Sequence, residues 1–123
     1  MDAQQSGKDQ PVIGTYIYVV HMGCPIGFVK IGISDNPDRR LAGMQTANPY
    51  PLKLSRCWGP FERARAMQLE AMLHRIFQED NARGEWFGVS PDKVAWALSS
   101  ITRLTDASFE EWLSAYEARE ASL

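Results

Sequence analysis

Two β-like runs near the start of the chain constrain its fold more than any other feature. Residues 14–20 and 28–33 are both rich in β-branched and aromatic side chains, which favour strands. The link 21–27 carries two glycines and a proline, and so short a link implies antiparallel pairing. Apolar groups on both faces of the first run predict a central position in the sheet. The chain is therefore expected to be organised around an antiparallel hairpin.

A short helix and a third strand are predicted next. Asn36 is a suitable capping residue, and Pro37 suits the first helical position. Leu41 and Met44 share one face of this helix, which is expected to be its buried stripe. Two prolines end the helix, and the loose alternation over 52–58 suits a strand.

Three further helices are predicted in the rest of the chain. The strongest spans about 60–79, and a short extended piece follows at 85–89. Ser90 caps a helix that ends near Arg103, and Ser108 with Glu111 resembles the capping box of a last amphipathic helix. These elements predict an α+β fold, in which helices flank a small three-stranded antiparallel sheet and two extra helices end the chain. The core stripe of the strongest helix is Ala66, Leu69, Leu73, Ile76 and Phe77.

Length and composition suit one globular domain. The chain has 123 residues, and we divide it into a flexible lead (1–11), the main domain (12–104) and a C-terminal helix packed on it (105–123). No apolar run approaches the roughly 18 residues of a membrane span, and the N-terminus is polar. The two cysteines form no CxxC pattern, so reduced thiols and a cytoplasmic location are expected. No sequence feature specifies an oligomeric state.

Charge is unevenly distributed along the chain. The total of 13 basic and 15 acidic residues gives a net charge of −2, which counts mildly against a high-affinity nucleic-acid binder. Segment 29–65 nevertheless holds seven basic and three acidic residues, whereas segment 105–123 holds five acidic residues and one arginine. The basic middle of the chain is therefore the part suited to phosphate.

Lys30, Gly32 and Arg40 are the first candidate site residues. Lys30 lies between two apolar residues on an expected core strand, and Gly32 leaves room for a ligand or another backbone to approach closely. Arg40 follows in the first turn of a helix, and a guanidinium group matches phosphate geometry. Each cation is alternatively a solvated surface charge. Tyr16 and Tyr18 share one strand face, where half-buried packing is the alternative to a role in a site.

Glu70 is the most informative acid. It lies beside the core stripe, with no lysine or arginine at helical spacing to pair with it. An unpaired carboxylate is costly there, so either a tertiary arginine or a metal ion is expected to satisfy it. His74 lies one turn later, where it could join a metal site or be a packed helix histidine. The chain has no P-loop, GxGxxG motif or Ser-His-Asp order.

Together these residues resemble the GIY-YIG nuclease superfamily. The first motif reads Tyr16-Ile17-Tyr18 and the second reads Lys30-Ile31-Gly32. The helical arginine and glutamate of the superfamily correspond to Arg40 and Glu70.

A closer resemblance is to the branch of phage and bacterial proteins with the T5 orf172 or meiotically up-regulated type of domain. In that branch the second motif reads KIG, and an asparagine-proline pair follows the arginine helix, with Gln45, Asn48 and Pro49 here. The branch also carries R-G-E-W-F after the glutamate helix, at 83–87 here. The resemblance covers about residues 13–89.

The resemblance implies phosphodiester cleavage with one divalent ion, Mg²⁺ or Mn²⁺, and DNA as the expected substrate. Glu70 would be the only protein ligand to the metal, and Arg40 would stabilise charge on the phosphate. Tyr18, or Tyr16 in its place, would act as general base or orient the attacking water. Lys30 replaces the superfamily's second tyrosine, and it would either favour the phenolate form of Tyr18 or bind phosphate.

Glu85 and the choice of function are left open by the sequence. Glu85 either adds a second acid to the site or closes the core together with its aromatic neighbours. A non-cleaving nucleic-acid-binding module of the same fold is one alternative function, and a protein-interaction module that uses helix 108–117 is another. The candidate nucleic-acid-binding residues are Gly32, Ser34, Arg39, Arg40 and His74.

Overall fold

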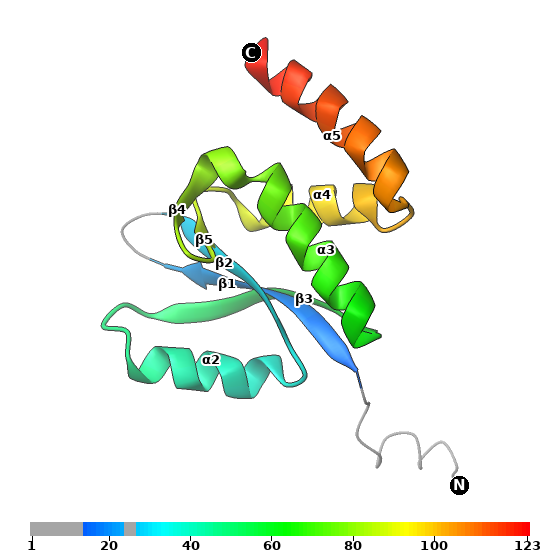
Figure 1. Cartoon of the computed structure of the whole chain (residues 1–123). Helices are drawn as coiled ribbons and strands as arrows, with labels where there is room; N and C mark the ends of the chain where they lie inside the picture. Colours follow the sequence, from blue (N-terminus) through cyan, green and yellow to red (C-terminus); the bar gives the residue numbers. More distant parts are fainter. Residues whose placement is uncertain (1–13, 24–26) are drawn as a thin grey trace, which may run out of the picture.

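The computed structural model describes residues 14–23 and 27–123 (Figure 1). The predicted lead 1–11 lies outside this part. The strands are β1 (Thr15–Met22), β2 (Phe28–Ser34), β3 (Leu52–Phe61), β4 (Asn81–Arg83) and β5 (Trp86–Phe87). The helices are α2 (Pro37–Thr46), α3 (Arg63–Ile76), the 3₁₀ turn η1 (Gln78–Asp80), α4 (Pro91–Ile101) and α5 (Asp106–Ala121).

The strands form one antiparallel sheet in the order β3-β1-β2-β5-β4. The predicted hairpin of β1 and β2 is confirmed, and β1 is central, as its two apolar faces predicted. The predicted number of strands, three, is wrong, because the sheet formed by the described residues has five. One of the two additional strands, β5, lies within the extended piece predicted at 85–89, whereas β4 has only three residues, too few to show a strand period. Gly84 lies between them in a left-handed conformation (φ 56°), which glycine adopts at little cost.

Strand β3 continues further than the sequence predicted. Its register pairs Thr15 of β1 with Phe61, so the chain stays extended through Gly59 and Pro60. Helix α3 therefore begins at Arg63, and the predicted start at residue 60 is wrong. Pairing with β1 outweighs the local preference of a proline for a helix start.

Helix α2 is capped as predicted, since the side chain of Asn36 accepts a hydrogen bond from the backbone N–H of Arg39 at 3.1 Å. It lies on one side of the sheet, with α3 and α4 on the other (Figure 1). The predicted buried stripe is wrong, because α2 has no buried residue, and Leu41 and Met44 are only half-buried.

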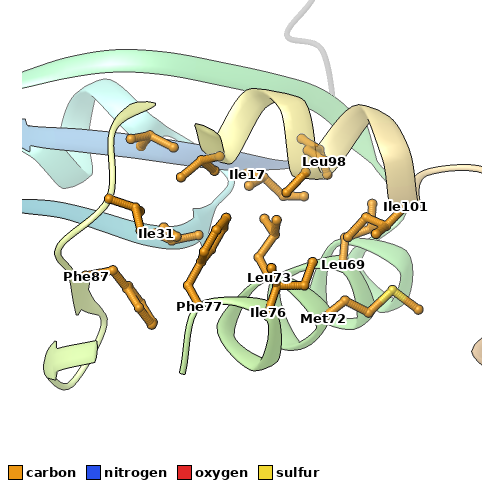
Figure 2. Close-up of a cluster of buried hydrophobic side chains, with 14 of the residues drawn as sticks. Ile17, Ile31, Leu69, Met72, Leu73, Ile76, Phe77, Phe87, Leu98 and Ile101 are labelled. Carbon is orange, nitrogen blue, oxygen red and sulfur yellow. The ribbon is translucent and has the colours of Figure 1, made fainter. Parts of the chain in front are cut away.

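The hydrophobic core lies between the sheet and α3, α4 and α5. Figure 2 shows Ile17 and Ile31 of the sheet together with side chains from α3 and α4. The predicted stripe of α3 is confirmed, since every member is at most 4% exposed. The core cluster includes Ile17, Val19, Val29, Ile31, Leu69, Met72, Leu73, Ile76, Phe77, Phe87, Leu98, Ile101 and Phe109.

Helix α5 begins earlier than predicted. Its capping box joins Thr105 and Ser108: the Thr105 hydroxyl accepts from the backbone N–H of Ser108 at 3.2 Å, and Ser108 Oγ accepts from that of Thr105 at 2.8 Å. The predicted box of Ser108 with Glu111 is therefore wrong. The apolar face of α5 is buried in the core through Phe109 and Leu113, so it is not free to dock a partner. No helix in the described part of the chain has the length and apolar content needed to span a membrane.

Candidate functional site

The register of the β1–β2 hairpin places the tyrosine motif of β1 beside the glycine motif of β2. Tyr16 pairs with Ser34, and Tyr18 pairs with Gly32. Side chains alternate across a sheet, so these residues point away from the face that carries Ile17 and Ile31. The candidate residues of both strands therefore share the face opposite the main core.

Tyr18 and Gly32 are in direct contact. A Cβ atom added to Gly32 would lie 2.6 Å from the hydroxyl oxygen of Tyr18 and 2.7 Å from Cζ. The group that approaches this glycine closely is thus a phenol of the neighbouring strand. Tyr18 is 1% exposed overall, so its ring is fixed by packing.

Arg40 reaches the Tyr18 hydroxyl from α2. Its backbone N–H donates to the carbonyl of the capping residue Asn36 at 3.0 Å, which sets it in the first turn. Burial raises the pKa of Tyr18, and a hydrogen bond and charge from Arg40 offset this rise only in part. Arg39, Arg40 and Ser34 line one surface hollow between the end of β2 and α2.

Tyr16 does not join Tyr18 and Arg40. It is half-buried one pair further along the strands, and its ring packs near Gly59. It lines a separate hollow with Leu54 and Cys57. Of the two candidate tyrosines, Tyr18 is the one beside Arg40.

Glu70 and His74 reach the sheet from α3, at the edge of β2 that β5 leaves uncovered. Nε2 of His74 donates to the carbonyl oxygen of Ile31 at 2.9 Å, and the imidazole packs on Phe87 with ring centroids 4.9 Å apart. His74 is thus a packed helix histidine that fixes α3 to β2. Glu70 lies one turn earlier on α3, 4.0 Å from His74, and its charge raises the pKa of Tyr18.

The negative charge of the Glu70 carboxylate is balanced by little positive charge nearby. Its side chain is 19% exposed, and its one ion pair within the described residues is to His74 at 4.0 Å. Burial and the negative charge of Glu85 raise the pKa of Glu70, while His74, Lys30 and Arg63 lower it. No lysine or arginine of the described chain comes within 4.0 Å of it, so the tertiary arginine that the sequence allowed is absent from this part.

Lys30 is paired with Glu85. The two charged atoms lie 3.2 Å apart, and the ammonium is 5.9 Å from the centroid of the Trp86 ring. The pKa of Tyr18 is raised, and Lys30 is not among the groups that shift it. Both roles expected of Lys30, favouring the phenolate form of Tyr18 or binding phosphate, stay predictions.

The sequence left the role of Glu85 open and gave no indication of Arg63 as a site residue. Glu85 belongs to the site, because its Oε1 lies 3.2 Å from the position of a Cβ on Gly32. Arg63 starts α3, lowers the pKa of Glu70, and forms an ion pair of 3.5 Å with Asp35. Its spacing of two helical turns from Glu70 indicates this proximity once the start of α3 is known.

The Gln45 and Asn48 motif supports the loop between α2 and β3. Gln45 Nε2 donates to the carbonyl of Tyr50 at 3.0 Å, and its Oε1 accepts from the backbone N–H of Leu52 at 2.7 Å. Asn48 Oδ1 accepts from the backbone N–H of Tyr50 at 2.9 Å. These amides therefore hold the loop that sets α2 against β3.

The donors present fit one kind of metal. Glu70 and Glu85 offer carboxylate oxygens, which suit Mg²⁺ or Mn²⁺ with water completing the coordination. Within residues 14–23 and 27–123 no group of three or more His, Cys, Asp or Glu side chains could hold a metal.

Comparison with known proteins gives one family match. The family model described as T5orf172 domain matches residues 15–102, which include every site residue described above. Neither the search of curated proteins nor the search of solved structures gives a match.

Proposed function

The chain belongs to the T5orf172 domain family, and from that membership we propose that it is a metal-dependent endonuclease that cleaves phosphodiester bonds, with DNA as the substrate. The observation that carries the proposal is that three chemically different groups from three elements act on one another around the Tyr18 hydroxyl, which lies against Gly32. These are the phenol of Tyr18 (β1), the guanidinium of Arg40 (α2) and the carboxylate of Glu70 (α3).

Glu70 is the proposed ligand for one Mg²⁺ or Mn²⁺ ion. Its poorly compensated carboxylate favours a cation. When bound, such an ion supplies Lewis acidity to a phosphate oxygen and lowers the pKa of a bound water.

The remaining groups bind phosphate and orient water. Arg40 provides charge-assisted hydrogen bonds to the phosphate oxygens, whose negative charge grows during the reaction. Tyr18 keeps its proton at neutral pH because burial raises its pKa, so we assign it to orienting the attacking water rather than to removing its proton. Lys30 is assigned to an adjacent phosphate.

Plasmid cleavage tests the proposal. Supercoiled DNA is incubated with the protein and Mg²⁺ or Mn²⁺, and nicked and linear products are measured. The wild type is expected to cleave, and the Glu70→Gln variant to lose activity by about 100-fold or more, the scale for loss of a main charge-stabilising group. Glu111→Gln on the exposed side of α5 is the matched control. Equal cleavage by Glu70→Gln and the control would refute the metal assignment.

A non-cleaving nucleic-acid-binding module is the second candidate. The Lys30–Glu85 ion pair favours it, because Lys30 is already occupied by a protein carboxylate. Salt-dependent DNA binding without any cleavage in Mg²⁺ or Mn²⁺ would support this function instead.

A further inference from the structure

Glu85 is held rigidly beside the site by its backbone. It follows Gly84 in the turn between β4 and β5, and its carbonyl oxygen accepts a hydrogen bond from the N–H of Ile31 at 3.1 Å. This bond continues the β2–β5 pairing by one residue beyond Trp86. The residue is thus anchored to the strand that carries Gly32.

The carboxylate of Glu85 turns toward the same corner as the Tyr18 phenol. Its Oε1 and the Tyr18 hydroxyl lie 3.2 Å and 2.6 Å from the one point where a Cβ of Gly32 would be. Glu85 also raises the pKa values of both Tyr18 and Glu70, so its charge acts on both groups. Two carboxylates therefore face one site from α3 and from the edge of the sheet.

The positive charge nearby is divided unequally between the two acids. The Lys30 ammonium forms its ion pair with Glu85 at 3.2 Å and acts on Glu70 from further away. Within the described chain, Glu70 has neither lysine nor arginine within 4.0 Å. Two close like charges with one shared ammonium leave an excess of negative charge that a divalent cation would neutralise.

We propose that Glu85 is a second carboxylate for the divalent ion, in addition to Glu70. The inference rests on the proposed metal-dependent function and goes beyond the single ligand, Glu70, of that proposal. Oxygen donors from two carboxylates suit a hard cation such as Mg²⁺ or Mn²⁺. Lys30 then holds Glu85 in place and contacts phosphate when the substrate arrives.

The competing explanation is that Glu85 only neutralises Lys30. The two roles differ in a measurement that needs no DNA and no turnover. A metal-facing carboxylate contributes to affinity for the ion itself, whereas a partner of Lys30 leaves that affinity unchanged.

Calorimetric titration of the full chain with MnCl₂ separates the roles. We expect Glu70→Gln to abolish measurable binding and Glu85→Gln to weaken it by about tenfold or more, the scale for loss of a group that supports a metal site. Lys30→Met removes the competing ammonium and is expected to bind Mn²⁺ at least as tightly as the wild type. Glu111→Gln is expected to match the wild type.

Three results would overturn the inference. One is wild-type affinity in Glu85→Gln, with binding lost in Glu70→Gln; this rejects Glu85 and leaves the proposed function intact. The second is an equal loss in Glu85→Gln and Lys30→Met, which assigns the effect to their ion pair. No binding by the wild type rejects both the inference and the metal assignment. If Glu85→Gln melts at a lower temperature, Glu85→Asp, which keeps the charge but shortens its reach, is expected to weaken binding as well.

Discussion

The hydroxyl group of Tyr18 lies against the α-carbon of Gly32 on the adjacent strand, closer than any side chain at position 32 would allow. This contact fixes the phenol at the point where Arg40 and Glu70 act on it. Gly32 is therefore needed so that the ring of Tyr18 can cross the neighbouring strand.

Gly32→Ala is expected to destabilise the fold by about 1–3 kcal/mol, the usual cost of overpacking. The added methyl would lie 2.6 Å from the Tyr18 hydroxyl, and the buried ring has little space to move. Urea denaturation measures the change in the free energy of unfolding. Gly43→Ala in α2 is the matched control, because nothing lies within 4 Å of its Cβ position. That change is expected to stabilise by about 0.5–1 kcal/mol, since alanine favours helices. Equal effects of the two substitutions would contradict the contact.

Arg40→Ala is expected to weaken DNA binding and to reduce the salt dependence of the affinity by about one unit of slope, as for the loss of one phosphate contact. Cleavage is expected to fall by about 10²–10³-fold. Fluorescence anisotropy at several salt concentrations measures the slope. Arg103→Ala, which changes an exposed arginine, is the control for charge alone. An equal loss of slope in both variants would show that Arg40 makes no specific contact.

Glu70→Gln is expected to make the protein more stable at neutral pH in the absence of metal. The pKa of Glu70 is raised by burial and by Glu85, so the folded state binds this proton more tightly than the unfolded chain. The free energy of unfolding therefore falls as pH rises from the unfolded carboxyl range, near 4.5, to the raised pKa. The Glu70→Gln variant has no carboxyl group at this position, so its free energy of unfolding does not fall for this reason.

Thermal melting at several pH values tests the effect of Glu70. The advantage of Glu70→Gln is expected at pH 7 and should vanish below the unfolded carboxyl pKa, where the wild-type side chain is protonated in both states. Adding Mn²⁺ is expected to stabilise only the wild type, because a ligand that binds the native state raises its stability. A variant less stable than the wild type at pH 7 without metal would contradict the assigned cause.

Gln45→Ala is expected to lower the free energy of unfolding by about 1–3 kcal/mol. Its amide satisfies backbone groups of Asn48, Tyr50 and Leu52, and those groups lose their partner in the variant. Urea denaturation measures the loss, and Gln78→Ala on the exposed turn η1 is the control. A loss of the same size in Gln78→Ala would show that the hydrogen bonds of the Gln45 amide make no specific contribution to stability.

The hairpin and the long helices could be predicted because their patterns are long and strong. Ile17 and Val19 alternate with Tyr18 over a full strand, and Leu69 and Leu73 recur at helical spacing. Family motifs then pointed to Tyr18, Arg40 and Glu70, which the fold brings together from separate elements.

The sequence predicts the extended piece 85–89, which contains β5, but not its place at the edge of the site, since that place depends on pairing between distant segments. Trp86 and Phe87 form a two-residue strand whose position is set by Lys30 and Val29 on β2, and two residues carry no period. The place of Glu85 follows from that pairing alone. For the same reason the sequence predicted that a ligand or another backbone approaches Gly32, whereas the register of β1 brings in the side chain of Tyr18.

The contacts within the site join residues that are separated by very different lengths of chain. Tyr18 and Gly32 meet within one hairpin, so their contact requires only a short loop to close. Glu70 and Glu85 join them only after α3 and β5 have docked on β2, which closes much longer loops. We therefore expect the tyrosine half of the site to assemble early in folding and its acidic half to assemble late, in the step that completes the sheet.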